Sequence, residues 1–161
     1  MARFTVTQGV RAPASEVWAA LVDWRRHGDW APLTTVRVTT SRPGGVGAQF
    51  VARTGIGPLA FDDPMTVEFW QPPAGDEPGR CEVVKRGRVV LGRAWFTVVP
   101  LPGGTSRVEW GEDVTVTPHR LTRFAGPVLS LAGRAGFGAT LRAMAREVEK
   151  QNRRPLPPRS A

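Results

Sequence analysis

The side chain best suited to acid–base chemistry in this sequence is Glu112, in the alternating segment 107–117. In an extended strand every second side chain points to the same face. On that parity Glu112 shares a face with four apolar residues: Val108, Trp110, Val114 and Val116. Burial among them would raise the pKa of an unpaired carboxyl toward the range of a general acid or base. The alternative is structural: Glu112 pairs with an arginine, or lies in water at the open end of a sheet.

The histidines are the other groups that titrate near neutral pH. His27 lies between two short predicted helices, at a plausible pocket mouth, and is the second candidate acid–base residue; His119 follows the last predicted strand. Surface positions would also explain both. Arg53 could bind a carboxylate or phenolate, but the parity of its strand directs it outward. No spacing indicates a nucleophilic triad or a metal site, so we expect no metal and no cofactor.

Aromatic residues are too numerous for one small core, which suggests that some of them line a pocket. Phe69, Phe96 and Trp110 fit the inward parity of their strands. The candidate ligand-binding residues are Phe50, Phe69, Phe96, Trp110, Phe124, Leu131, Phe137 and Leu141. The alternative is a solid aromatic core without a cavity.

One strand and two short helices are expected before the rest of the sheet. The segment 4–10 alternates, and Pro13, with Ser15 near the cap position, predicts a helix start. Six more strands are expected at 34–41, 47–54, 65–70, 81–85, 89–99 and 107–117. Asp62 and Asp63 fit a turn before Pro64. Short connections between successive strands indicate an antiparallel meander, and the one cysteine, in the strand at 81–85, is expected to be buried.

The last part of the chain is predicted to be helical. One apolar set repeats at helical spacing and consists of Phe137, Leu141, Met144 and Val148. An earlier set is out of phase with it and consists of Leu121, Phe124, Val128, Leu131 and Ala135. Three glycines lie at the changeover, and each destabilises a helix interior by about 1 kcal/mol. We therefore expect a kinked helix, or a short helix followed by a longer one, with Pro127 at a break or a helix start.

The composition indicates one globular domain, at residues 1–151, followed by a basic, proline-rich disordered tail at 152–161. The net charge of +8 raises the question of nucleic acid. The basic residues are scattered, however, and no RNA-recognition, helix-turn-helix or zinc-finger pattern accompanies them, so we interpret them as a solvated surface. No apolar run reaches the ~20 residues that span a bilayer, and no signal-peptide layout is present. We expect a cytoplasmic protein; its oligomeric state is not defined by the sequence.

The order of elements predicts an α+β protein in which a curved antiparallel sheet wraps around a long C-terminal helix and leaves a pocket between them. This order, with the segments at 11–32, 67–75 and 101–114, resembles the helix-grip fold of the START/Bet v 1-like (SRPBCC) superfamily, in its polyketide cyclase/dehydrase-like branch. The resemblance covers residues 3–150 and implies seven strands, with two short helices after the first.

Three functions are compatible with this resemblance, since fold alone does not define function. The first is binding of a small hydrophobic ligand, such as a lipid, an isoprenoid or an aromatic polyketide. The second is a cyclase, aromatase or dehydratase in which Glu112 or His27 assists. The third is a protein- or RNA-interaction module. Aromatase and cyclase relatives often hold polyketide oxygens with hydroxyls and arginines, and the absence of tyrosine here favours an apolar ligand.

Overall fold

The computed structural model describes residues 1–117 and 126–153. Its elements are β1 (Ala2–Val10), α1 (Ala14–Val22), the 3-10 helix η1 (Trp24–Arg26), α2 (His27–Trp30), β2 (Thr34–Val38), β3 (Gln49–Thr54), η2 (Gly57–Leu59), β4 (Phe61–Gln71), β5 (Gly79–Arg86), β6 (Val90–Leu101), β7 (Thr105–Val116) and α4 (Gly126–Asn152). His119 and Phe124 and the expected tail beyond residue 153 lie outside the described residues.

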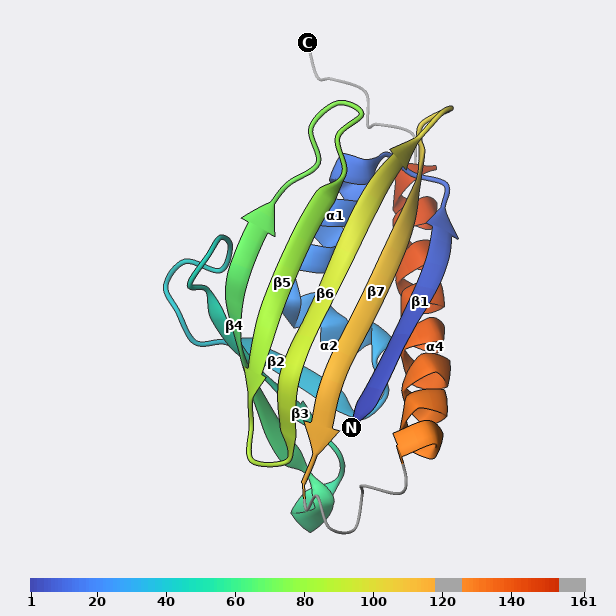
Figure 1. Ribbon diagram of the computed structural model, residues 1–161. Helices are drawn as coiled ribbons and strands as arrows, with labels where there is room; N and C mark the ends of the chain where they lie inside the picture. The colour runs from blue at the N-terminus through green and yellow to red at the C-terminus, as the bar shows by residue number, and fades with distance from the viewer. Residues whose placement is uncertain (118–125, 154–161) are drawn as a thin grey trace.

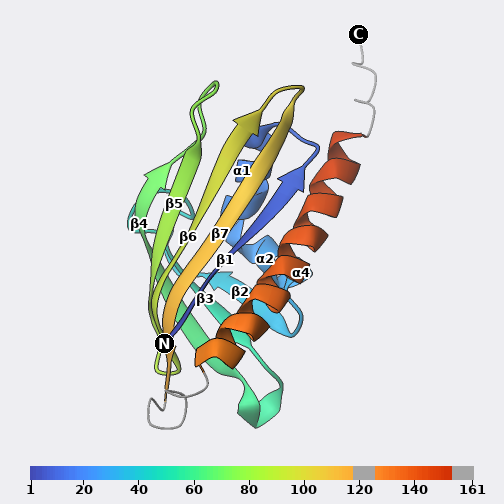
Figure 2. The ribbon, with the colours of Figure 1, turned by 45° about the vertical axis from the view of Figure 1, so that its right-hand side comes forward.

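The strands form one antiparallel sheet in the order β1-β7-β6-β5-β4-β3-β2. Neighbours in the sheet are neighbours in sequence except at the pair of β1 with β7, which brings the first strand beside the last. Figure 1 shows α1 and α2 behind the curved sheet, and Figure 2 shows α4 running along it beside β1. This is the helix-grip α+β arrangement predicted from the order of elements.

The first helix begins as expected at Pro13, but its cap differs from the prediction. No side chain caps the helix, so the role expected of Ser15 is wrong. Instead the carbonyl of Pro13 accepts hydrogen bonds from the backbone N–H groups of Glu16 at 3.0 Å and Val17 at 3.2 Å. Trp18 and Leu21 then enter the core, where they pack with residues from β6, β7 and the second half of α4. One end of the molecule is therefore solidly packed.

The long helix α4 is continuous from Gly126 to Asn152, so a break at the glycines is wrong, whereas Pro127 lies in its first turn, as expected of a helix start. Leu121 and Phe124 of the earlier apolar set lie outside the described residues. Packing against β1 explains the continuity at Gly133. A Cβ atom there would lie 2.4 Å from Cε1 of Phe4, which means that only glycine lets the helix approach the strand so closely. Tertiary packing of this kind routinely outweighs helix propensity. Among the described residues, no helix is long and apolar enough to cross a bilayer.

The strand β4 starts earlier than predicted. Asp62 and Asp63 do not form a turn but pair in the ladder with Arg53 and Ala52 of β3. Pro64 is tolerated in the strand because the ladder of β4 with β5 begins only at Met65. The first residues of β4 therefore pair with β3 alone. Proline is tolerated at such an edge position.

Candidate functional site

A cavity of about 430 Å³ lies between the sheet and the first half of α4. This volume is within the range of about 300–1,000 Å³ typical of small-molecule sites. All seven strands contribute to its wall, β4 only through its first half. Residues of α2 and α4 line the other side. The lining residues most exposed to solvent include Pro32, Ala132 and Gly136.

Stacked aromatic rings form one wall of the cavity. Trp110 of β7 lies between two phenylalanines, with centroid distances of 5.6 Å to Phe96 and 5.4 Å to Phe137 of α4. Deeper in the core, Trp24 stacks on Phe50 at 4.1 Å. Such rings offer a large apolar contact area and a preference for planar or branched hydrocarbon partners.

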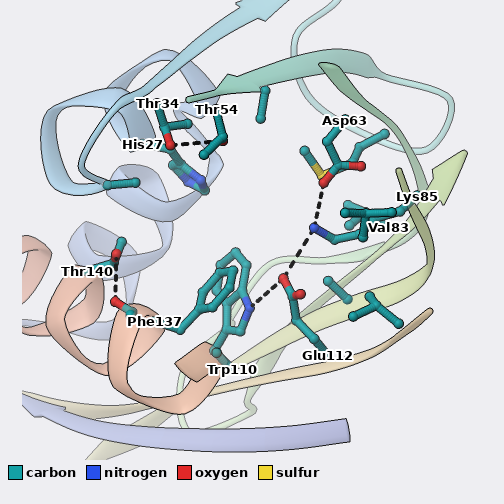
Figure 3. A pocket seen from close by; sticks show the side chains of 18 of the residues that line it. His27, Thr34, Thr54, Asp63, Val83, Lys85, Trp110, Glu112, Phe137 and Thr140 are labelled. Atoms are coloured by element: carbon teal, nitrogen blue, oxygen red, sulfur yellow. Dashed lines mark hydrogen bonds and ion pairs between the residues drawn. The ribbon is translucent and has the colours of Figure 1, made fainter. Parts of the chain in front are cut away.

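Next to this aromatic wall lies a buried ionic cluster of Asp63, Lys85 and Glu112, which come from β4, β5 and β7 (Figure 3). The ammonium of Lys85 lies 2.8 Å from Oδ2 of Asp63 and 3.3 Å from Oε1 of Glu112. The indole N–H of Trp110 donates to the same Oε1 at 3.4 Å. Asp63, Lys85 and Glu112 are 6%, 7% and 4% exposed, so solvent screens this cluster very little.

Small residues on β6 make the cluster possible, because β6 lies between β5 and β7. Gly92 pairs with Lys85 in the ladder, and Ala94 pairs with Glu112. Neither residue places a bulky side chain between the ammonium and the carboxylate. Gly92 is also required by the backbone: its φ is +141°, and a Cβ atom there would lie 2.2 Å from the carbonyl oxygen of Asp113.

The cluster shifts the titration of its members in a defined direction. Burial raises the pKa of Glu112 above its usual value, and the attraction of Lys85 offsets only part of this effect. Burial by itself would lower the pKa of Lys85, but the carboxylates of Glu112 and Asp63 outweigh it and raise that pKa. Lys85 therefore stays protonated, and Glu112 holds its proton more tightly than an exposed carboxyl does.

His27 lies at the side of the cavity formed by α2 and is partly buried. Its Nε2 atom is 2.7 Å from the carbonyl oxygen of Leu21, which can only accept a hydrogen bond. Nε2 therefore carries the proton, and Nδ1 is left as an acceptor. Burial lowers the pKa of His27, so its ring is neutral at neutral pH. The ring packs against Trp30 at 5.7 Å and Trp110 at 6.0 Å.

A second polar group ties α2 to α4 beside the cavity. The carboxylate of Glu147 accepts hydrogen bonds from the indole of Trp30 and the guanidinium of Arg26, each at 2.5 Å. The hydrogen bond from Trp30, followed by that from Arg26, lowers the pKa of Glu147. Because Trp30 and His27 both line the cavity, this contact positions part of its wall.

Most residues predicted from the sequence to form the site do line the cavity: Glu112, His27, Phe50, Phe96, Trp110, Phe137 and Leu141. That they contact a ligand stays a prediction. The sequence leaves open whether Glu112 is buried and unpaired, paired with an arginine, or in water at the open end of the sheet; the structure buries it and pairs it with a lysine. Arg53 points outward as its parity indicated and pairs with Asp62 at 3.1 Å.

Two predicted residues do not reach the cavity. Phe69 is 41% exposed, because a β-bulge between Val67 and Phe69 shifts the register of β4 and reverses the inward parity expected of Phe69. Leu131 is 70% exposed, because α4 is continuous and turns Leu129, Ala132 and Gly133 toward the cavity instead. Phe124 lies outside the described residues.

Sequence reasoning missed Asp63 and Lys85. Lys85 had a usable signal, since it shares the strand parity of Cys81 and Val83, both buried. A lysine on an apolar face requires a buried carboxylate. Asp63 had no such signal, because its neighbourhood of acidic residues and proline is typical of a turn.

The curved antiparallel sheet, the long C-terminal helix and the partly open, mainly apolar cavity between them define a helix-grip protein. The chain belongs to the family described as "Polyketide cyclase / dehydrase and lipid transport", whose model matches residues 1–149. A search among curated protein sequences found no match.

Several solved structures share this fold. The Zhui aromatase/cyclase from Streptomyces sp. R1128 is 16% identical, with a TM-score of 0.68 over 94% of this chain and 95% of that chain. A START superfamily protein from Mycobacterium smegmatis is 16% identical, with a TM-score of 0.66 over 92% and 98%. Norcoclaurine synthase from Thalictrum flavum is 14% identical, with a TM-score of 0.65 over 93% and 95%. At these identities the likeness shows the fold alone.

Proposed function

We propose that the protein binds one small, mainly apolar molecule in the cavity between the sheet and α4, in the size range of a lipid, an isoprenoid or an aromatic polyketide. The observation that carries this proposal is the cavity of about 430 Å³ itself, walled by the stacked rings of Phe96, Trp110 and Phe137. Burial of apolar ligand surface contributes roughly 25 cal/mol per Å² before the costs of association. Glu112 at the polar end sets the orientation.

Filling the cavity tests the proposal. Val83 faces the cavity from β5, whereas Val84 faces the outer side of the same strand. Binding of the uncharged dye Nile red, measured by fluorescence titration, should be saturable in the native protein and retained in Val84→Phe. Val83→Phe should weaken it strongly, with a circular dichroism spectrum like that of the parent. Equal binding by both variants, or no saturable binding by the parent across a panel of apolar dyes, would contradict the proposal.

A second candidate function is an enzyme of the cyclase, aromatase or dehydratase type. It is favoured by one observation, a buried carboxyl of raised pKa with a lysine beside it in a mainly apolar cavity. Catalysis would consist mainly of holding a flexible poly-β-carbonyl chain in a reactive fold, with proton transfer by Glu112 or by Nδ1 of His27. Glu112→Gln should then abolish turnover of such a substrate while Nile red binding persists. Unchanged turnover would remove Glu112 from this role.

A further inference from the structure

The ionic cluster leaves carboxylate oxygens without partners at the polar end of the cavity. Glu112 accepts both of its hydrogen bonds on Oε1, so Oε2 has none from the described residues. Oδ1 of Asp63 is buried and also lacks a partner among them. Both side chains are more than nine-tenths buried and belong to the cavity wall. Buried polar atoms are almost always satisfied, and an exception calls for an additional partner.

The balance of donors and charges defines what that partner must be. Two carboxylates face one ammonium, and both ion pairs that Lys85 makes among the described residues are to these carboxylates. Lys85 is the one permanently charged cation in the described lining of the cavity, since His27 is neutral. An incoming anion would therefore meet an excess of negative charge and acceptors. The ammonium itself occupies the position between the carboxylates where a metal ion would bind.

We propose that the polar end of the cavity receives a hydrogen-bond donor, a hydroxyl or a protonated amine, carried by an otherwise apolar ligand, and that it rejects a carboxylate at the same position. The donor would bind Oε2 of Glu112, beside the buried Oδ1 of Asp63, while the apolar body lies against the aromatic wall of Trp110 and Phe137. This inference rests on the proposed function, because it names the chemistry of the ligand that the cavity takes.

Four fluorescent probes with one apolar body test the inference: 1-pyrenemethanol, 1-pyrenemethylamine, 1-pyrenecarboxylate and 1-methylpyrene. Their Kd values, measured by fluorescence titration at neutral pH, should show the alcohol and the amine binding about tenfold or more tightly than the carboxylate, as expected for one hydrogen bond to a charged group. The methyl compound should bind, but more weakly than the alcohol.

Paired substitutions then locate the effect. Glu112→Gln and Asp63→Asn should each reduce the preference for the amine over the carboxylate. Asp62→Asn is the matched control, because Asp62 is the adjacent residue on the outer face, paired with Arg53; it removes the same charge and should leave the preference unchanged. Thermal unfolding of each variant shows whether it is folded, and if Asp63→Asn is not, Glu112→Gln alone decides.

The outcomes separate the two proposals. Failure of all four probes to bind would overturn the proposed function, and the inference with it. Binding of 1-methylpyrene with equal or tighter binding of the carboxylate would leave the apolar cavity standing and overturn the inference. An amine preference that Asp62→Asn removes as fully as Glu112→Gln would also overturn it, since surface charge would then be the cause.

Discussion

Replacing Lys85 by methionine removes the ammonium of the buried cluster and keeps the length of the side chain. In the parent protein its Nζ lies 2.8 Å from Asp63 and 3.3 Å from Glu112, and the three side chains are only 5–8% exposed. The variant leaves two carboxylates of like charge without a counterion. Removing one partner of a buried ion pair typically destabilises a protein by about 3–5 kcal/mol. That is a large share of the roughly 5–15 kcal/mol that stabilises a domain, so urea denaturation should detect it readily.

The pH dependence has a defined sign. The pKa of Glu112 is raised in the folded protein, so the folded state holds this proton more tightly than the unfolded state. Stability therefore falls as the pH rises from the unfolded value, about 4.3, through the raised folded value. Without Lys85 the carboxyl loses its stabilising cation and its pKa rises further. The loss of stability in Lys85→Met must then be larger at about pH 7.5 than at about pH 5.

Arg86→Met is the matched control for this experiment. Arg86 is the next residue, its side chain is 67% exposed, and it contacts Glu68 on the outer face at 3.4 Å. Exposed pairs of this kind contribute about 0–1 kcal/mol. The double variant Lys85→Met/Glu112→Gln should recover part of the lost stability, since it also removes one buried charge. Equal urea midpoints for Lys85→Met and Arg86→Met at both pH values would refute the buried ionic cluster.

Three other features give measurable expectations. Gly92→Ala should lower the free energy of unfolding by about 1–3 kcal/mol because Gly92 has a positive φ and a Cβ atom there would meet the backbone. Gly136→Ala should be neutral or stabilising, since a Cβ atom at that position meets nothing within 4 Å. A higher melting temperature for Gly92→Ala than for Gly136→Ala would contradict this. Glu147→Gln should speed amide hydrogen exchange around Trp30 at neutral pH. The difference between variant and parent should vanish when the pH falls below the lowered pKa of Glu147. An unchanged exchange rate at pH 7 would show that the hydrogen bond from Trp30 to Glu147 does not hold α2 against α4. Burial raises the pKa of the Cys81 thiol to about 12, so it should react with Ellman's reagent at pH 8 only after unfolding, and rapid reaction of the folded protein would show the thiol to be accessible.

The sequence was most informative where a single periodicity ran without interruption. In β7, strict alternation predicted that Trp110 and Glu112 face inward together, and both line the cavity. Such alternation is reliable in an antiparallel sheet whose two faces meet different environments. The order of the elements was equally informative, because a sheet with one apolar face and a single long helix has few ways to cover that face.

Prediction from the sequence failed where a shift of one residue in strand register or helix phase changes which side chains face the cavity. A bulge in β4 turned Phe69 to the solvent, and no local sequence signal distinguishes a bulged strand from a regular one at that point. The phase of α4 turned Leu131 outward, because packing at Gly133 against Phe4 decides which face the helix presents. The ionic cluster is a long-range feature: Asp63 and Lys85 are 22 residues apart, and only the sheet register brings them together.

The cavity is a consequence of small side chains rather than of a poorly placed helix. The second half of α4 is firmly packed through Leu141, Met144 and Val148, so the helix cannot close further onto the sheet. Ala94, beside the cluster, and Gly136, at the exposed side of the cavity, occupy lining positions where a leucine or phenylalanine would fill the space. The same small residues that leave room for a ligand also leave the carboxylate oxygens unpaired. A ligand entering with the wrong end would keep those oxygens unsatisfied, at a cost of about 1–3 kcal/mol for each. Apolar contact therefore supplies affinity along the whole chamber, and the unpaired oxygens supply orientation at one end of it.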